Sequence, residues 1–485
     1  MTGDAPAAAG SGRTVVRGAW VLAMDPACEL VRDGAVAFGE DGAIAAVGPW
    51  ERLRAQFPGA AVVGDGNGIV LPGFVNAHTH LTEGLIAGMG ETASLWEWFD
   101  RVVSPAARVT TREDVRVGAL LKGAEMLLSG ITTVNDMSCH RNLGSLASLG
   151  AVDGLAAMGL RGIVSFGAEN LYDGAPSEDA FMAEHEALAD RIDGESLIGF
   201  RLGIGTVLGI SDELMTRSVA ACAEHGWAVH THLAEVREEL TESRARHGGR
   251  TTIEHSAHVG LLDHELIAGH CIWCGEHDIS LLAARDVAVA HSPVANMILA
   301  SGVCPVPRLR REGVRVGIGT DGAASNDGQD MFGAIKTAAL LQKVHTLRAD
   351  AISAIDVLRM ATLEGARALG LERSIGSLEP GKRADVVLLD GDTPELAAIH
   401  DPWQQVVYCA TSRCVSHVWV DGAARVAGGR LVAQDLRAIA GEARALARDL
   451  AVRAGLGGES VLLGGEARAF PPSARAGARV ETVRA

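Results

Sequence analysis

The pattern of apolar and polar positions divides the chain into a long central region and two flanking regions. In the central region, residues 72–375, short apolar runs alternate with longer segments of helical periodicity. The runs that can form strands lie at 73–80, 130–137, 161–169, 198–206, 227–233, 266–273, 287–293 and 314–322. Eight strands alternating with helices over about 300 residues predict a (β/α)8 barrel of the TIM type, although a doubly wound open sheet has the same local pattern.

The flanking regions have a different pattern of apolar and turn residues. Residues 13–71 and 376–432 consist of short apolar runs separated by turn residues, which is typical of antiparallel β-structure. We therefore expect both chain ends to build one small β-sandwich beside the barrel, within the α/β class. The last part, residues 433–485, begins with an Ala- and Arg-rich stretch that predicts a helix and continues as a tail.

Charge and composition narrow the choice of partner. The net charge of −17 excludes nucleic-acid binding through a general basic surface and favours a small-molecule substrate. No apolar run reaches the roughly 20 residues of a membrane helix, so we expect no membrane partner. The first residues lack the pattern of a secretory signal, and the eight cysteines are scattered, which indicates a reducing, cytoplasmic setting.

Histidine pairs mark the ends of two predicted strands. His78 and His80 end the first strand of the central region, and His230 and His232 end the fifth. Side chains two residues apart on a strand point to the same side, so both members of a pair can face one point. A single HxH pair is a moderate signal, but two of them on strand ends favour a common site.

Three further polar residues lie at or just after the ends of predicted strands. His270 ends the sixth strand, Asp321 ends the eighth, and Glu235 comes three residues after the second histidine pair. In a barrel, these strand ends converge on the face that carries the active site. Several imidazoles and one carboxylate make a site suited to Zn²⁺ or Fe²⁺. The other histidines of the chain are expected to be structural or exposed.

The motifs around these residues resemble those of a known family. They are PGFVNAHTH, HTHLAE, GHCIW, HSPVANMILASG, GTDGAASND and GSLEPGKRADVVLLD. Together they are similar to the amidohydrolase superfamily, and within it to the ATZ/TRZ-like group, which contains S-adenosylhomocysteine and methylthioadenosine deaminases, 8-oxoguanine deaminase and triazine hydrolases. The similarity extends from about residue 13 to residue 430.

The resemblance implies one divalent transition metal, zinc in preference to iron, bound by His78, His80, His232 and Asp321. Binuclear relatives bridge two metals with a lysine on the fourth strand, whereas the only lysine between the two histidine pairs is Lys122, in a helical segment. The resemblance also implies a homo-oligomer, a dimer or larger.

Three residues are expected to move protons or stabilise charge. Asp321 takes a proton from the attacking water, His270 orients that water, and Glu235 protonates the ring nitrogen of the substrate. The function expected from these roles is hydrolytic deamination of an amino-substituted nitrogen heterocycle, with release of ammonia. The presence of both Glu235 and Asp321 favours deamination over dechlorination.

The pocket departs from that of the nucleoside deaminases. Ala106 or Ala107, Phe166 and Val207 fall where those enzymes have polar residues that hold the substrate. The sequence therefore predicts a compact or less polar substrate and not a ribose-dependent S-adenosylhomocysteine deaminase. Glu83 and Trp98, together with Phe166 and Val207, are the candidate substrate-binding residues.

Two alternatives remain open at the level of sequence. One is the hydrolytic loss of chloride, an alkylamine or an alkylthiol from a triazine-like ring. The other is a barrel that has lost catalysis and serves as a scaffold. The complete set of expected ligands and proton-transfer residues argues against a scaffold.

Overall fold

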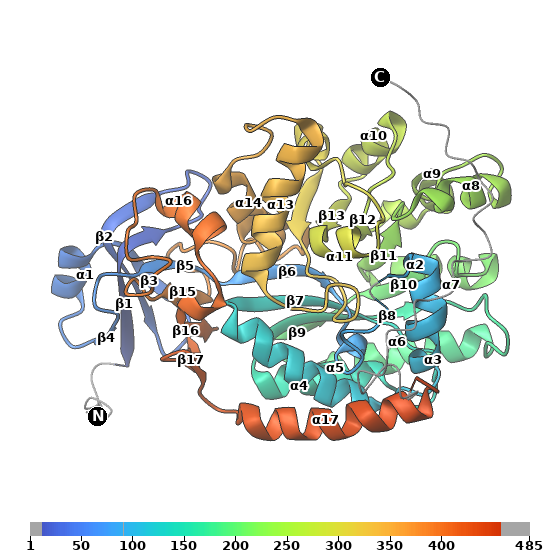
Figure 1. Ribbon diagram of the computed structural model, residues 1–485, viewed down its shortest axis with the longest axis horizontal. Coiled ribbons are helices and arrows are strands. Elements are labelled where there is room, and N and C mark those ends of the chain that lie inside the picture. Colours follow the sequence, from blue (N-terminus) through green and yellow to red (C-terminus); the bar gives the residue numbers. More distant parts are fainter. Residues whose placement is uncertain (1–11, 91, 457–485) are drawn as a thin grey trace.

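The computed structural model describes residues 12–90 and 92–456, which form two sheets surrounded by helices (Figure 1). One sheet belongs to a parallel barrel built from the middle of the chain, and the other is built from both chain ends. This arrangement confirms the α/β class and the TIM-type barrel expected from the sequence.

The barrel strands follow one another in sequence order, β6 to β8 and β10 to β14, and all of their pairings are parallel. They are β6 (Phe74–Thr79), β7 (Ile131–Ser138), β8 (Arg161–Ala168), β10 (Leu202–Thr206), β11 (Val229–Leu233), β12 (Leu266–His270), β13 (Ala288–His291) and β14 (Arg315–Ile318). The last strand returns to the first, because Asp321 donates its backbone N–H to the carbonyl of His78, at 2.9 Å. All carboxyl ends therefore meet on one face.

One strand expected from the sequence is divided. The run 198–206 forms a short β9 (Ile198–Phe200), which pairs with β8, and then β10. Arg201 separates the two strands; it is buried and donates to Glu265 Oε1 at 2.6 Å. A buried guanidinium that needs carboxylate and carbonyl partners explains the interruption of the apolar run.

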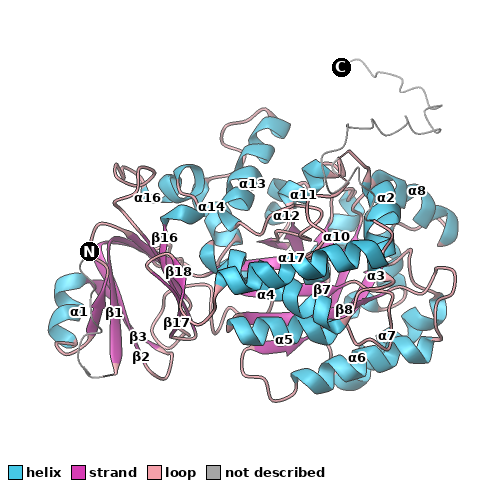
Figure 2. Cartoon of the chain, turned by 60° about the horizontal axis from the view of Figure 1, so that its bottom comes forward, coloured by secondary structure: helices cyan, strands magenta, loops and turns pink. Residues whose placement is uncertain are grey.

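Helices cover the outside of the barrel (Figure 2). They are α4 (Arg112–Leu128), α5 (Ser148–Met158), α6 (Glu178–Ile192), α7 (Asp212–His225), α8 (Arg237–Arg246), α9 (Thr252–His258), α10 (Glu276–Ala284), α11 (Pro293–Ile298), α12 (Val306–Arg311), α13 (Met331–Thr346), α14 (Ala354–Met360) and α15 (Leu363–Ala368). The short helices α2 (Leu95–Trp98) and α3 (Ser104–Ala107) follow β6. Local sequence starts several of them: Thr111 and Asp114 form a capping box at α4.

The second sheet joins the two chain ends in the order β18-β17-β16-β15-β5-β1-β2-β3, with β4 on β1. Its strands are β1 (Arg13–Leu22), β2 (Leu30–Gly39), β3 (Ile44–Pro49), β4 (Ala61–Val63), β5 (Ile69–Pro72), β15 (Val386–Leu389), β16 (Val415–Val420), β17 (Ala423–Ala427) and β18 (Arg430–Leu431). Most pairings are antiparallel, as expected, but β1 pairs with β4 and β5 in parallel. Helix α1 (Trp50–Gln56) packs on this sheet, and α16 (Pro402–Gln404) follows β15.

Helix α17 (Leu436–Arg453) returns from this sheet to the barrel and lies along α4 (Figure 1). Arg453 pairs with Asp114 at 2.8 Å, and Arg116 pairs with Glu442 at 2.8 Å. The expected tail beyond residue 456 lies outside the described residues. Among the helices described, none is long and apolar enough to span a membrane.

Candidate metal centre and substrate cavity

The barrel brings four histidines and one aspartate together at the carboxyl ends of its strands. His78 lies in β6, His80 follows it, His232 lies in β11, and His270 ends β12. Asp321 follows β14. The structure therefore unites all the residues that the sequence predicts as metal ligands.

The atoms that face one another are suited to a metal ion. The ligand atoms of His78, His80 and His232 lie within 4.8 Å of one another, and His80 Nε2 is 3.2 Å from His232 Nε2. Asp321 Oδ1 lies 3.3 Å from His78 Nε2 and 3.4 Å from His80 Nε2. Three imidazole nitrogens and a carboxylate oxygen are the donors that zinc takes in proteins.

The second nitrogen of each ring is fixed by the surrounding strands. His80 Nδ1 donates to the carbonyl of Met137 at 2.7 Å, and His232 Nδ1 donates to the carbonyl of Gly205 at 2.6 Å. His78 Nδ1 lies 2.8 Å from His230 Nε2. Such outer contacts set the orientation of the rings and leave the other nitrogen free for a metal.

Burial prepares these histidines as neutral ligands. It lowers the pKa of His80 to about 4 and lowers the pKa of His78 and His232. Within the described part of the chain, His78 Nε2 is buried without a hydrogen-bond partner, which fits a role as a metal ligand. Burial opposes ionisation of Asp321, but the imidazoles around it, with His78 Nε2 at 3.3 Å, hold its pKa well below the ordinary value. These donors fit one divalent cation.

The backbone is strained where two of these side chains leave their strands. His270 has a φ of 69° and Asp321 a φ of 65°, in the left-handed region that only glycine adopts freely. Such conformations cost about 1–3 kcal/mol each and concentrate at functional sites. Both side chains are thus aimed into the site at a cost in backbone energy.

His270 and Glu235 form a polar pair beside the candidate ligands. His270 Nε2 lies 3.4 Å from Glu235 Oε2 and 3.8 Å from Asp321 Oδ2, while its Nδ1 is 2.9 Å from Asn296 Oδ1. Burial acts against the charged imidazole, but Glu235 and Asp321 raise the pKa of His270. Burial also raises the pKa of Glu235. Both shifts favour the protonated forms, so the pair is suited to hold and transfer protons.

A cavity of about 370 Å³ opens above these residues, within the usual size range of small-molecule sites, roughly 300–1,000 Å³. His80, His232, His270, Glu235 and Asp321 form part of its lining. Its apolar part includes side chains of α2 and of the loops after β8 and β10, which suits an aromatic ring.

Two of the four predicted substrate-binding residues line this cavity, and two do not. Glu83 and Trp98 belong to its lining, and Glu83 accepts a hydrogen bond from the backbone N–H of Ala324 at 3.0 Å. Phe166 and Val207 are buried in the core and do not belong to the lining of this cavity. Neighbouring residues on an extended chain point to opposite sides, and it is Gly167, next to Phe166, that lines the cavity.

Sequence reasoning missed several residues of the site. Arg141, Glu169 and Thr206 line the cavity but belong to none of the recognised motifs. His230 was expected at the site as a member of the second histidine pair, but its contact with His78 Nδ1, at 2.8 Å, was not predicted. Glu169 directly follows β8 and Thr206 ends β10, so their position at the carboxyl ends of strands was the signal that could have found them.

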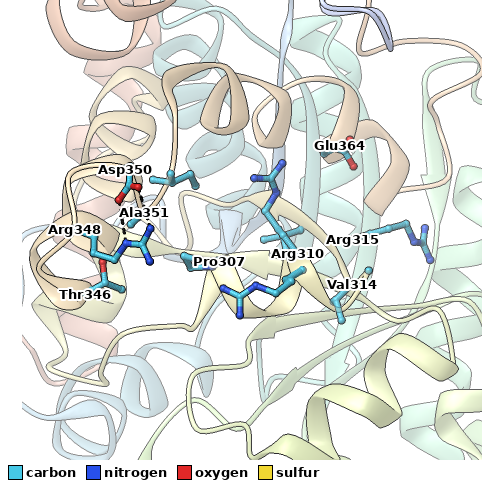
Figure 3. A pocket seen from close by; sticks show the side chains of 13 residues that line it. Pro307, Arg310, Val314, Arg315, Thr346, Arg348, Asp350, Ala351 and Glu364 are labelled. Atoms are coloured by element: carbon cyan, nitrogen blue, oxygen red, sulfur yellow. Dashed lines mark hydrogen bonds and ion pairs between the residues drawn. The ribbon is translucent and has the colours of Figure 1, made fainter.

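A second cavity, of about 610 Å³, lies where β14 begins, at the opposite end of this strand from Asp321 (Figure 3). Three of its four arginines are paired with acidic residues: Arg310 with Asp356, Arg315 with Asp286, and Arg348 with Asp350, each at 2.9 Å. None of the candidate metal ligands lines it. This second cavity is therefore separate from the candidate metal centre.

Comparison with known proteins identifies the family. The model of the amidohydrolase family matches residues 69–425. A 5-methylthioadenosine/S-adenosylhomocysteine deaminase from Syntrophobacter fumaroxidans is 37% identical over 89% of this chain and 96% of its own length. A 5'-deoxyadenosine deaminase from Methanopyrus kandleri is 34% identical over 84% of this chain and 92% of its own. The chain belongs to the amidohydrolase family.

Solved structures agree with this assignment. An adenosine deaminase from Xanthomonas campestris, crystallised with bound zinc, has a TM-score of 0.85 and 32% identity, covering 90% of this chain and 98% of that one. An atrazine chlorohydrolase from Arthrobacter aurescens shares the fold, with a TM-score of 0.81 at 24% identity, over 90% of this chain and all of that one. With named deaminases among its relatives, the chain is a hydrolase that acts on carbon–nitrogen bonds, of the deaminase type.

Proposed function

We propose that this enzyme removes an amino group from an aminated purine-like heterocycle by hydrolysis, using one divalent metal, zinc in preference to iron. The observation that carries the proposal is the convergence of His78, His80, His232 and Asp321 with the pair His270–Glu235 at the base of one cavity. The names of the relatives, which are adenosine and deoxyadenosine deaminases, support the substrate class.

The metal would be held by the Nε2 atoms of the three histidines and by Asp321. Bound there, it would lower the pKa of a water molecule to about 7 and so provide a nucleophile at neutral pH. Asp321 would take a proton from this water, because its carboxylate stays ionised. His270 would orient the water, and its proximity to both carboxylates would stabilise its charged form.

Glu235 would protonate the ring nitrogen next to the carbon under attack. Its raised pKa favours the protonated carboxyl group at higher pH than for an exposed glutamate. Ser301 Oγ lies 3.4 Å from Glu235 Oε1 and keeps the side chain close to His270. After the attack, the proton that Asp321 had taken from the water would pass to the departing amine, and the proton of the added hydroxyl group would return to Glu235 as the carbonyl forms.

The expected preference for a substrate less polar than a nucleoside is not carried into this proposal. It rested on three positions, and of these only Ala107 lines the cavity. Phe166 and Val207 face the core, so they exclude no polar substituent. The cytoplasmic location and the assembly into a homo-oligomer stay predictions.

A panel of purified substrates tests the function. Aminated purines, pyrimidines, pterins and triazines are incubated with the enzyme, and ammonia, chloride and alkylamine are measured separately. We expect ammonia, in equal amount to the substrate consumed, from an aminopurine. Chloride or alkylamine release from a triazine without ammonia from any aminopurine would replace deamination by the alternative reaction.

A further inference from the structure

Three polar side chains that the proposed reaction does not use form one wall of the substrate cavity. Glu169 follows β8, Thr206 ends β10, and Arg141 lies in the loop after β7. These strands are neighbours in the barrel. The wall is therefore a local feature at the carboxyl ends of three adjacent strands.

The carboxylate of Glu169 is held in a fixed position. Thr206 Oγ1 donates to Glu169 Oε1 at 2.9 Å and itself accepts the backbone N–H of Gly209 at 3.0 Å. The side chain also lies against two glycines: a Cβ atom added at Gly205 or Gly209 would come within 2.6 Å of it. Glycine at both positions leaves space for this carboxylate in this place.

The guanidinium of Arg141 is fixed as well. It lies over the rings of Phe99, at 5.0 Å, and Tyr172, at 4.4 Å, and Nη1 donates to Ser104 Oγ at 2.8 Å. Its Nη2 is 3.7 Å from Glu169 Oε2, which is an ion pair but too long for a direct hydrogen bond. Both groups thus keep unused hydrogen-bonding capacity next to the cavity.

This wall adjoins the candidate metal centre. Gly205, the residue before Thr206, provides the carbonyl that accepts the hydrogen bond from His232 Nδ1 at 2.6 Å. A ring placed for attack beside His232 therefore has the wall within reach of a substituent. The small side chain of Ala107, which also lines the cavity, leaves room on that side.

We infer that Glu169 and Arg141 form a hydroxyl-binding subsite, and that the substrate is an aminated ring with neighbouring hydroxyl groups on its substituent, as in a ribonucleoside. This inference rests on the proposed function. A carboxylate accepts hydrogen bonds from two hydroxyl groups, and the guanidinium donates to their oxygens. A substrate without hydroxyl groups leaves the remaining hydrogen-bonding capacity of these two groups unused beside the bound substrate, which disfavours its binding.

Two substrates that differ in the hydroxyl groups alone test the subsite. The values of kcat/KM for ammonia release are measured with adenosine and with 2',3'-dideoxyadenosine. We expect the wild-type enzyme to prefer adenosine by about tenfold or more, the scale of lost hydrogen bonds in a buried site. Glu169→Gln should reduce this preference to within about threefold, through the KM for adenosine, and leave dideoxyadenosine nearly unchanged.

Two further variants separate recognition from structure. Arg141→Met keeps the apolar stem and should also reduce the preference. Glu178→Gln alters a carboxylate that accepts from Asn170 Nδ2 at 3.0 Å in the same loop region but does not line the cavity. This control should retain the wild-type preference, whereas loss of the preference in it would assign the effect to loop structure and overturn the inference.

The remaining outcomes are distinct. Equal kcat/KM for both nucleosides in the wild-type enzyme, or an undiminished preference in Glu169→Gln, overturns the subsite and leaves deamination standing. Absence of ammonia from every aminated ring overturns the proposed function and the subsite together. The wild-type comparison needs no variant, so it decides the question even if Glu169→Gln does not fold.

Discussion

At the scale of single residues, Glu235 is the proposed proton donor on which deamination depends. It is 5% exposed, and its Oε2 lies 3.4 Å from His270 Nε2. Glu235→Gln keeps the shape of the side chain but removes the acidic proton. We expect normal metal content and a kcat lowered by about 10²-fold or more.

The matched control is Glu238→Gln, an exposed position near the start of α8. It should leave kcat unchanged. Steady-state kinetics and elemental analysis of both variants provide the comparison. Near-normal turnover in Glu235→Gln would assign proton transfer to another residue.

A second residue-scale prediction concerns the pH dependence of stability. His185 in α6 is fully buried, and this burial lowers its pKa from 6.5 to about 4. Between these two pH values, the unfolded chain binds a proton that the native state does not bind. Stability therefore falls as the pH decreases through this window, by about 3 kcal/mol at most from this group.

His185→Leu removes this titration. Among the described residues, neither ring nitrogen of His185 has a hydrogen-bond partner, so an apolar replacement should not reduce stability at pH 7. The free energy of unfolding, measured by denaturant titration at several pH values, should depend less steeply on pH between 6.5 and 4 in the variant. Parallel curves for the two proteins would show that His185 does not contribute.

The sequence predicted the candidate metal ligands because polar residues at strand ends are few and their spacing is regular. It did not predict what holds their rings, because the acceptors for His80 and His232 are backbone carbonyls of Met137 and Gly205, on other strands. For the residues that face the substrate, the sequence is less informative for a different reason. Neighbouring residues of a strand face opposite sides: Phe166 is buried in the core, whereas the next residue, Gly167, lines the cavity.

At the scale of elements, close helix packing depends on glycine. Helices α4 and α5 approach so closely that a Cβ atom at Gly150 would lie 2.2 Å from the carbonyl oxygen of Arg112. Backbone cannot move aside as a flexible side chain can. We therefore expect Gly150→Ala to lower the free energy of unfolding by about 2 kcal/mol or more.

Gly333 provides the matched control. Like Gly150, it is the third residue of its helix, here α13, but it is exposed and nothing lies within 4 Å of an added Cβ atom. Gly333→Ala should therefore raise stability by about 0.5–1 kcal/mol, the difference in helix propensity. Equal effects of the two substitutions in chemical denaturation would contradict the role of close packing.

The periodicity of apolar residues predicted which segments form helices and which form strands. It did not predict which strands pair with one another. The apolar runs near both chain ends predicted strands, whereas nothing in them shows that β5 pairs with β15 in the register Pro72 to Val386. The parallel pairing of β1 with β5 likewise depends on the path of the chain through α1 and β4. Such contacts are set by tertiary packing between segments far apart in sequence.

At the scale of the whole molecule, the barrel and the metal centre depend on each other. The candidate ligands come from β6 and the residue after it, at one end of the order of barrel strands, from β11 in its middle, and from the loop after β14 at its other end. A bound metal would therefore connect segments separated by more than two hundred residues. The unfolded chain cannot present this arrangement, so metal binding should stabilise the native state.

The central claim is that a single metal at this centre makes the enzyme a deaminase. The most direct measurement removes the metal by chelation and then restores zinc stepwise, recording ammonia release from the best aminopurine and the metal content per chain. We predict that activity is lost on chelation, rises in proportion to zinc and reaches a plateau at about one equivalent. Full activity without metal, or a plateau at two equivalents, would contradict the account.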